Sequence, residues 1–433
     1  MAEKVLILGL SKSGIAAAKF AASKGCDVYL TETKNEVNLE QVKELQNLGV
    51  KVEHGSHSEE FISGASFAVT SPGIPPKSEI FRRLNEKNIK IISEVEFAYL
   101  NTKTPFIAIT GTNGKTTTTA LVSHILSKKF SAPVCGNIGV PPTSLIEENH
   151  DFLVCEISSY QAQMTEKFKA KIACWTNFTP DHIDWHGGLE NYFNAKAKIF
   201  LPPQEPEFAI LNAQDTKLKE FSKQCQNVIF FDDGNDCGIK NNSIFYKGEE
   251  IISLKDCPLV GHHNYQNIMC GIIIAKLVGM NNSDIREQIM SFRAPEHRLE
   301  KVREMDGITF FNDSKATNPE ASIVAIDSFN NQNVALILGG RDKNTDLTEM
   351  CHSINKHIKT VLLIGEATER FEENLKKNGF SNIIKEHTME DAIDKAISLK
   401  PDVVLLSPAC ASFDMFKSYE HRGEVFKDYV LSK

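Results

Sequence analysis

The sequence predicts an α/β protein with three domains, each built on a parallel β-sheet covered by helices. Three observations favour this fold class. The chain has 433 residues, which is too many for one compact core. Short β-branched runs, glycine-containing loops and helix-like segments alternate in three separate stretches, as in repeated βα units. A glycine-rich loop of the phosphate-binding type follows the first apolar run of the middle stretch.

We expect domains at 1–94, 95–294 and 295–433, because the pattern restarts near residue 95 and Pro295 interrupts it again. A polar, turn-rich interval at 232–257 indicates a small β excursion within the middle domain. The expected strands are 4–8, 27–31, 67–70 and 90–92 in the first domain, 105–110, 152–155 and 171–176 in the second, and 308–311, 334–338, 360–364 and 403–406 in the third.

Composition and charge narrow the classes of protein that fit. The net charge is -8 and no basic patch is visible, which disfavours a nucleic-acid partner. No apolar run approaches the roughly 20 residues that span a bilayer, and no leader segment precedes the first strand. The 10 cysteines stand singly without a Cys-x-x-Cys pair, as reduced core residues do. We therefore expect a cytoplasmic protein that binds neither nucleic acid nor a membrane.

The first domain begins with an altered dinucleotide motif. Gly9-Leu10-Ser11-Lys12-Ser13-Gly14 follows the first strand, with Ser11 where G-x-G-x-x-G has its middle glycine. That change disfavours NAD, although a helix beginning after Ser13 could still receive a phosphate at its N-terminus. Glu32 ends the next strand, where it could hydrogen-bond a ribose, and Ser71-Pro72-Gly73 could form another wall. These features predict a Rossmann-like domain. The alternative interpretation is a tight turn without a ligand.

The middle domain carries the strongest signal. Thr110-Gly111-Thr112-Asn113-Gly114-Lys115-Thr116-Thr117 stands between an apolar strand and a helix-like segment. Loop N–H groups would hold triphosphate oxygens, Lys115 would neutralise them and the Thr116 hydroxyl would ligate Mg²⁺. Ile109 occupies a position where the usual pattern has glycine. The motif predicts a P-loop NTPase-like central domain, and a third set of βα units predicts a Rossmann-like C-terminal domain.

Three later residues are candidates for the same site. Glu156 ends a neighbouring strand, so its carboxylate can face the loop. His182, flanked by Asp181 and Asp184, could be a metal ligand, although a lone histidine is more often simply solvated. From spacing alone, we would expect Lys196 to be an ordinary exposed lysine on a helix.

Several motifs, in order along nearly the whole chain, resemble the Mur ligases of peptidoglycan precursor synthesis. They are Gly111-Thr112-Asn113-Gly114-Lys115-Thr116, Gly136-Asn137-Ile138-Gly139, Glu156-Ile157-Ser158-Ser159, Asp181-His182-Ile183-Asp184 and Asn312-Asp313-Ser314-Lys315-Ala316-Thr317-Asn318. Segments 407–417 and 419–423 are most similar to the members that add D-glutamate. Two alternatives stay open: another ligase of this family, folylpolyglutamate synthases included, and a non-catalytic nucleotide switch.

The resemblance implies roles for particular residues. The catalytic group would be Lys115, His182 and Lys196, and two Mg²⁺ ions would be held by Thr116, Glu156, His182 and a carbamylated Lys196. ATP would contact Gly111, Thr112, Asn113, Gly114, Lys115, Thr116, Thr117, Asn267, Arg298 and Asp313. The uridine nucleotide would contact Ser13, Glu32, Thr33, Gly73 and Asn137. D-glutamate would contact Lys315, Thr317, Lys343, Ser412 and Tyr419. Tyr419 replaces a Phe and Glu32 an Asp of the familiar pattern.

The resemblance also implies the reaction. An ATP-dependent ligase would phosphorylate the carboxylate of UDP-N-acetylmuramoyl-L-alanine and couple the resulting acyl phosphate to D-glutamate. The expected cofactors are ATP and Mg²⁺, the expected partners are these two small substrates, and the expected state is a monomer.

Overall fold

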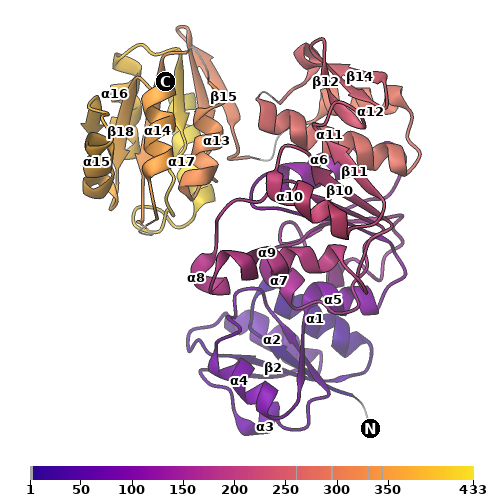
Figure 1. The fold of residues 1–433 in the computed structure, drawn as a ribbon. Coiled ribbons are helices and arrows are strands. Elements are labelled where there is room, and N and C mark those ends of the chain that lie inside the picture. Colours follow the sequence, from indigo (N-terminus) through magenta and orange to yellow (C-terminus); the bar gives the residue numbers. More distant parts are fainter. Residues whose placement is uncertain (1–2, 260, 294–295, 330–331, 343–344) are drawn as a thin grey trace. The chain divides into compact units, whose positions relative to one another are not determined.

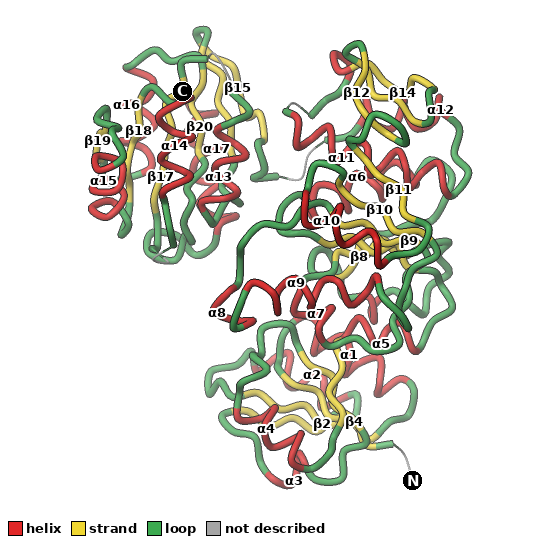
Figure 2. Tube along the Cα trace, in the orientation of Figure 1, coloured by secondary structure: helices red, strands yellow, loops and turns green. Residues whose placement is uncertain are grey.

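The computed structural model describes residues 3–259, 261–293, 296–329, 332–342 and 345–433 (Figures 1 and 2). The chain forms two compact units. The first comprises Met1–Pro258 with Tyr265–Phe292, and the second comprises Leu259–Asn264 with Arg293–Lys433. Two sheets belong to the first unit and one sheet to the second. The predicted α/β class is confirmed.

The N-terminal sheet is entirely parallel, with strand order β3-β2-β1-β4-β5. Its elements are β1 (Lys4–Leu8), α1 (Lys12–Ser23), β2 (Asp27–Glu32), α2 (Leu39–Asn47), β3 (Lys51–His54), α3 (Glu59–Ile62), β4 (Phe67–Thr70), α4 (Glu79–Glu86), β5 (Lys90–Ser93) and α5 (Glu94–Leu100). Val5 and Ile7 of β1 enter the core on one face, and Leu6 and Leu8 enter the core on the other. The strand order reverses between β1 and β4, so their carboxyl ends border the crevice where ligands bind in such sheets.

The central sheet has the order β14-β13-β12-β11-β10-β9-β6-β8-β7. Its elements are β6 (Phe106–Thr110), α6 (Lys115–Leu126), β7 (Val134–Gly136), η1 (Pro142–Ser144), β8 (Leu153–Glu156), α7 (Ser159–Gln163), β9 (Ile172–Trp175), α8 (Ile183–His186), α9 (Leu189–Ala197), η2 (Lys198–Phe200), β10 (Phe208–Asn212), α10 (Thr216–Phe221), η3 (Ser222–Gln224), β11 (Val228–Phe231), β12 (Cys237–Lys240), β13 (Ser243–Tyr246), β14 (Glu249–Ser253), η4 (Leu254–Asp256), α11 (His262–Leu277) and α12 (Asn282–Ser291). The strands from β7 to β12 are parallel, and β12–β14 form an antiparallel meander, which confirms the predicted β excursion.

The third sheet, in the second unit, has the order β15-β16-β20-β17-β18-β19. Its elements are β15 (Glu300–Met305), β16 (Ile308–Asn312), α13 (Pro319–Ile326), β17 (Val334–Gly339), α14 (Thr348–His357), β18 (Thr360–Ile364), α15 (Thr368–Lys377), β19 (Ile383–Lys385), α16 (Met389–Ser398), β20 (Val403–Leu406) and α17 (Tyr419–Ser432). All pairs are parallel except β15 with β16, so this edge departs from the wholly parallel sheet that the sequence predicts.

No helix in the described ranges combines the length and the apolar character that crossing a lipid bilayer requires.

Helix α5 contributes residues to two hydrophobic cores of the first unit, one at the N-terminal sheet and one at the central sheet. Phe97 packs with the N-terminal core, whereas Val95 and Ala98 pack with the central core. Glu94, the first residue of α5, is only 2% exposed. Its Oε1 atom accepts hydrogen bonds from Thr143 N and Oγ1, at 2.7 and 2.5 Å, while Oε2 has no hydrogen-bond partner among the described residues. Burial raises the pKa of the Glu94 carboxyl to about 7, against the opposing effect of the Thr143 donors.

Replacing Glu94 by glutamine is expected to change how stability depends on pH. Because the folded-state pKa lies above the unfolded one, the protonated carboxyl stabilises the fold at low pH. That contribution is lost as the pH rises from about 4.5 through about 7. The wild type should therefore lose roughly 3 kcal/mol relative to Glu94→Gln between pH 5 and 8. Denaturant unfolding followed by the fluorescence of the buried Trp175 measures this difference; parallel pH curves for the two proteins would contradict it.

Candidate active site

The glycine loop between β6 and α6 has the tight conformation that its sequence predicts. Gly111 has φ +148°, and a Cβ atom there would lie 2.0 Å from Thr176 Oγ1. Gly114 has φ +80° and precedes the first residue of α6, with the side chain of Asn267 only 2.7 Å from the position a Cβ would take. Glycine is therefore required at both positions, because the loop packs closely against Thr176 and Asn267.

Residues at the end of β9 brace the loop. Asn177 Oδ1 accepts a hydrogen bond from Asn113 N at 2.8 Å, and Asn177 Nδ2 donates to Asn113 O at 3.0 Å. Thr176 Oγ1 donates to the same carbonyl at 2.6 Å. The loop shape is thus fixed by side chains of a neighbouring strand, so little ordering is left for a ligand to impose.

Glu156, at the carboxyl end of β8, faces the loop as expected. It is almost fully buried, and its Oε2 atom accepts a hydrogen bond from Thr116 Oγ1 at 2.9 Å. Its Oε1 atom accepts one from Asn137 Nδ2 at 2.8 Å. A hydroxyl and a carboxylate, both ligand types that Mg²⁺ takes, are therefore held side by side at the start of α6. Asn267 is close as well, since its Oδ1 accepts a hydrogen bond from Thr118 Oγ1 at 3.0 Å.

Two lysines converge on one carbonyl of the loop. Lys115 Nζ lies 2.9 Å from Gly111 O, and Lys196 Nζ lies 2.7 Å from the same oxygen. Lys196 is 1% exposed, so the prediction of an exposed helix lysine is wrong. Its side chain points from α9 into the interior. Burial, and then the charge of Lys115, hold the pKa of Lys196 well below its usual value, although Asp181 and Glu156 oppose this shift.

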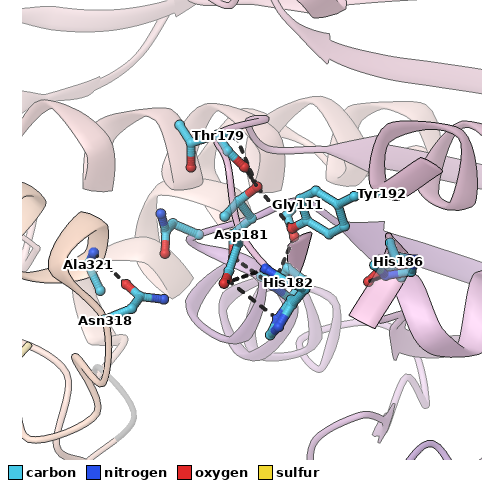
Figure 3. A network of polar contacts seen from close by, with 12 residues as sticks. Gly111, Thr179, Asp181, His182, His186, Tyr192, Asn318 and Ala321 are labelled. Carbon is cyan, nitrogen blue, oxygen red and sulfur yellow. Dashed lines mark hydrogen bonds and ion pairs between the residues drawn. The ribbon is translucent and has the colours of Figure 1, made fainter. Parts of the chain in front are cut away.

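His182 stands among acidic and aromatic neighbours (Figure 3). It has φ +52°, and its backbone N–H donates to Asp181 Oδ1 at 2.8 Å. Its Nε2 atom lies 3.4 Å from Asp181 Oδ2, so the flanking acid is close enough to orient the ring. The ring of Tyr160 packs against it at a centroid distance of 5.0 Å. Within the described ranges, no three His, Cys, Asp or Glu side chains gather as a metal site of those types alone.

Sequence reasoning missed Tyr192, which joins these groups. Its hydroxyl lies 3.1 Å from Thr112 Oγ1, and the Lys196 ammonium sits 4.9 Å from its ring centroid. Thr112 Oγ1 also donates to Thr179 O at 3.1 Å. Tyr192 stands four residues before Lys196 on α9, and this helical spacing was a usable signal.

The strand-to-helix turn of the N-terminal sheet has a hydroxyl lining. Helix α1 begins at Lys12, earlier than expected, because Ser11 caps it by accepting a hydrogen bond from Gly14 N at 3.3 Å. Ser11 Oγ also lies 2.7 Å from Ser71 Oγ and 3.0 Å from Ser13 Oγ. The residue that replaces the middle glycine therefore ties the β1 and β4 ends of the crevice together.

Glu32, at the end of β2, is bound to the same turn. Its carboxylate accepts hydrogen bonds from Leu10 N at 3.0 Å, Lys34 N at 3.1 Å and Thr33 Oγ1 at 3.3 Å. Burial alone would raise the pKa of Glu32, but these donors outweigh it and the pKa lies below its usual value. Gly73 is exposed beside β4. Ser13, Glu32, Thr33 and Gly73 thus border one sheet edge.

The second unit holds the remaining candidates. Asp313 follows β16, is buried, and accepts hydrogen bonds from Leu299 N at 3.2 Å and Ser407 Oγ at 2.8 Å. Burial raises the pKa of Asp313 to about 6, even though the charge of Arg298 opposes the shift. Ser412 is 2% exposed, in the segment after β20. Lys343 lies outside the described residues.

A buried arginine organises this edge of the third sheet. Arg422 donates to Ser314 Oγ at 2.9 Å, Ser314 O at 2.8 Å and Cys410 O at 3.0 Å. Ser314 Oγ in turn donates to Tyr419 O at 2.8 Å, and the Lys315 ammonium lies 5.6 Å from the Tyr419 ring centroid. Lys315 and Tyr419 are therefore brought together. Thr317 lies in the loop before α13, whose cap is the contact from Ala321 N to Asn318 Oδ1 at 2.8 Å, drawn in Figure 3.

These features define a class of protein. A glycine loop between a buried central strand and a helix, with a lysine at the helix start and a hydroxyl on a neighbouring strand's carboxylate, is the arrangement of P-loop nucleotide-binding α/β proteins. Family models then match all three sheet regions. They are the Mur ligase MurD-like N-terminal domain at residues 3–93, the Mur ligase middle domain at 109–275 and the Mur ligase glutamate ligase domain at 297–410. The chain belongs to the Mur ligase family.

Curated relatives match almost end to end. A UDP-N-acetylmuramoylalanine–D-glutamate ligase of Caldanaerobacter subterraneus subsp. tengcongensis is 37% identical over 446 residues, covering 99% of this chain and 98% of the relative. A ligase of the same name from Koribacter versatilis is 39% identical over 443 residues, covering 99% and 97%.

Solved structures share the fold. The UDP-N-acetylmuramate–alanine ligase of Thermotoga maritima superposes with a TM-score of 0.63 at 20% identity, covering 99% of this chain and 100% of that one. A folylpolyglutamate synthase of Mycobacterium tuberculosis superposes with a TM-score of 0.59 at 15% identity, covering 75% and 92%.

Proposed function

We propose that this protein is an ATP-dependent ligase that joins D-glutamate to the carboxylate of UDP-N-acetylmuramoyl-L-alanine. The full-length relatives that carry the corresponding name support the substrates. The observation that carries the chemistry is the contact between the Thr116 hydroxyl and the Glu156 carboxylate beside the glycine loop. A cytoplasmic monomer stays a prediction of the sequence.

The loop and its neighbours suit a magnesium-bound triphosphate. Glycine at 111 and 114 lets the loop pack against Thr176 and Asn267 in a tight turn, in which N–H groups of residues 111–117 can bind phosphate oxygens. Thr116 and Glu156 would hold one Mg²⁺, which when bound neutralises charge on the transferring phosphoryl group. Asn267, beside Gly114, would contact the nucleotide from the side of α11. Arg298 and Asp313 of the second unit are proposed as further ATP contacts.

A second magnesium site would combine His182 with a carbamylated Lys196. The low pKa of Lys196 supports this modification, because only an uncharged amine can attack CO₂. The N–C bond forms as the amine loses a proton, and the product is an anion of the carboxylate type that a hard cation prefers. Asp181, 3.4 Å from His182 Nε2, would orient the imidazole.

The reaction would proceed in two steps. The carboxylate of UDP-N-acetylmuramoyl-L-alanine attacks the γ-phosphorus of ATP, which forms an acyl phosphate and releases ADP. The amine of D-glutamate then attacks the acyl carbon, loses a proton, and displaces inorganic phosphate. Lys115, at the start of α6, would offset the charge that develops on the phosphoryl oxygens. Exclusion of water from the site would protect the acyl phosphate.

Substrate selection is assigned to two sheet edges. The residues proposed to bind the uridine nucleotide are Ser13, Glu32, Thr33 and Gly73, together with Asn137. The residues proposed to bind D-glutamate are Lys315, Thr317, Lys343, Ser412 and Tyr419. The close approach of Lys315 and Tyr419 supports the second assignment, because an ammonium group there could meet a substrate carboxylate.

A phosphate-release assay tests the proposed function. The enzyme receives ATP, Mg²⁺ and UDP-N-acetylmuramoyl-L-alanine, and D-glutamate, L-glutamate, L-alanine and meso-diaminopimelate are offered in turn. Release should depend on D-glutamate and be at least about 100-fold slower with the other amino acids, since a site built for two carboxylates rejects ligands that misplace them. Release that is independent of the amino acid would indicate a nucleotide switch, and preference for another amino acid would indicate a different ligase.

A further inference from the structure

Helix α5 carries two buried carboxylates that the proposed reaction does not use. Glu94 and Glu96 are 2% and 0% exposed. They reach different segments of the central domain. Glu94 accepts hydrogen bonds from Thr143, in η1, whereas Glu96 accepts them from the backbone N–H groups of residues 166, 167 and 168 at 3.0, 2.8 and 2.9 Å. Burying a carboxylate is costly unless it is hydrogen-bonded, so these contacts are needed to hold the two side chains in the interior.

The Glu94 contact leads to the candidate site along a short path. Thr143 follows the loop 136–141, and this loop begins where β7 ends. At the start of the loop, which is the end away from Thr143, Asn137 N donates to Glu156 O at 2.9 Å and Asn137 Nδ2 donates to Glu156 Oε1 at 2.8 Å. The loop is therefore held at one end by Glu156 and at the other by Glu94.

The loop needs such anchors. Gly136 and Gly139 have φ +99° and φ +70°, and glycine loses more backbone freedom on ordering than other residues do. Between the two anchors, the backbone contact from Gly136 N to Val140 O, at 3.1 Å, closes the turn. A loop of this kind keeps a defined shape only while both of its ends are fixed.

We propose that Glu94 is a positioning residue, which by holding Thr143 fixes the 136–141 loop so that Asn137 is presented to the uridine-nucleotide substrate. The identity of that substrate rests on the proposed function. Glu94 itself touches neither substrate, and its effect passes through Thr143 and the loop backbone. Glu96 serves as the natural comparison, because it lies on the same helix, is equally buried, and binds a segment that does not carry Asn137.

Steady-state kinetics separate positioning from general stability. Glu94→Ala should raise the KM for UDP-N-acetylmuramoyl-L-alanine about tenfold while the KM for ATP changes less than about twofold, because only binding at the loop is weakened. Glu94→Gln keeps an acceptor for Thr143 and should restore the wild-type KM. Glu96→Ala should leave the ratio of the two KM values unchanged. Equal effects of Glu94→Ala and Glu96→Ala on that ratio would overturn the proposal.

Hydrogen exchange provides a readout that does not depend on the reaction. Amides of residues 136–144 should exchange about tenfold faster in Glu94→Ala, and those of residues 165–168 should do so in Glu96→Ala. Thr143→Val keeps the backbone donor and loses the hydroxyl, so it should loosen residues 136–144 to a smaller extent even if Glu94→Ala fails to fold. Unchanged exchange in Thr143→Val would refute the proposal. If the exchange pattern appears but no phosphate is released with the uridine substrate, the proposed function fails and the anchoring role stands.

Discussion

Replacing Lys115 by alanine is expected to lower kcat by about 10²–10³-fold or more, with little change in the free energy of unfolding. Lys115 begins α6, and its ammonium group lies 2.8 Å from Thr112 O and 2.9 Å from Gly111 O. In a P-loop this group stabilises charge that grows during phosphoryl transfer, and removing one such preorganised donor typically costs that factor. Initial rates of phosphate release at saturating ATP measure the effect.

Lys128, near the other end of the same helix, provides a matched control. Lys128 follows α6 and forms an exposed ion pair with Glu287 at 2.8 Å. Lys128→Ala removes the same charge from the protein but not from the loop, so its kcat should stay within about twofold of the wild-type value. If the two alanine variants behave alike, Lys115 does not act on the transferring group.

Replacing Lys196 by alanine is expected to reduce activity by a similar or larger factor, with partial recovery in added short-chain carboxylates. The side chain is buried against Gly111 O, and the proposed carbamate would supply an anion there. A small carboxylate can occupy the vacated volume and restore part of the charge. The measurement is phosphate release across a concentration series of acetate and formate.

Lys198 is the control for this second experiment. It lies two residues further along, burial also lowers its pKa, and its ammonium group donates to Gln163 O at 3.0 Å rather than to the loop. Lys198→Ala should retain most activity and gain nothing from carboxylates. Full activity of Lys196→Ala without any additive would remove Lys196 from the site.

The central loop could be predicted in detail because its motif is one contiguous run of residues between an apolar strand and a helix. Gly111 and Gly114 are demanded by backbone angles and close contacts, and Thr116 and Glu156 by the geometry of adjacent parallel strands. The burial of Lys196 could not be predicted this way. It depends on which face of α9 meets the core, and the apolar neighbours of Lys196 on both sides leave that face ambiguous.

Sheet edges were harder to predict than sheet centres. Strand β3 is partly exposed and β19 has only 3 residues, so neither carries an apolar run that separates strand from loop. The antiparallel β15 is rich in charged residues and was also missed. In contrast, the apolar sequence FAILN of β10 is a usable signal for a buried strand.

The sharing of α5 by two cores has a consequence for dissection of the molecule. A fragment ending at residue 94 would lack Phe97, which fills the N-terminal core, and one extended through Leu100 would leave Val95 and Ala98 uncovered. We expect neither fragment to fold on its own. Recombination between relatives should therefore succeed only where the crossover leaves this helix together with both of its neighbouring sheets, so we expect these two sheets to be exchangeable only as a pair.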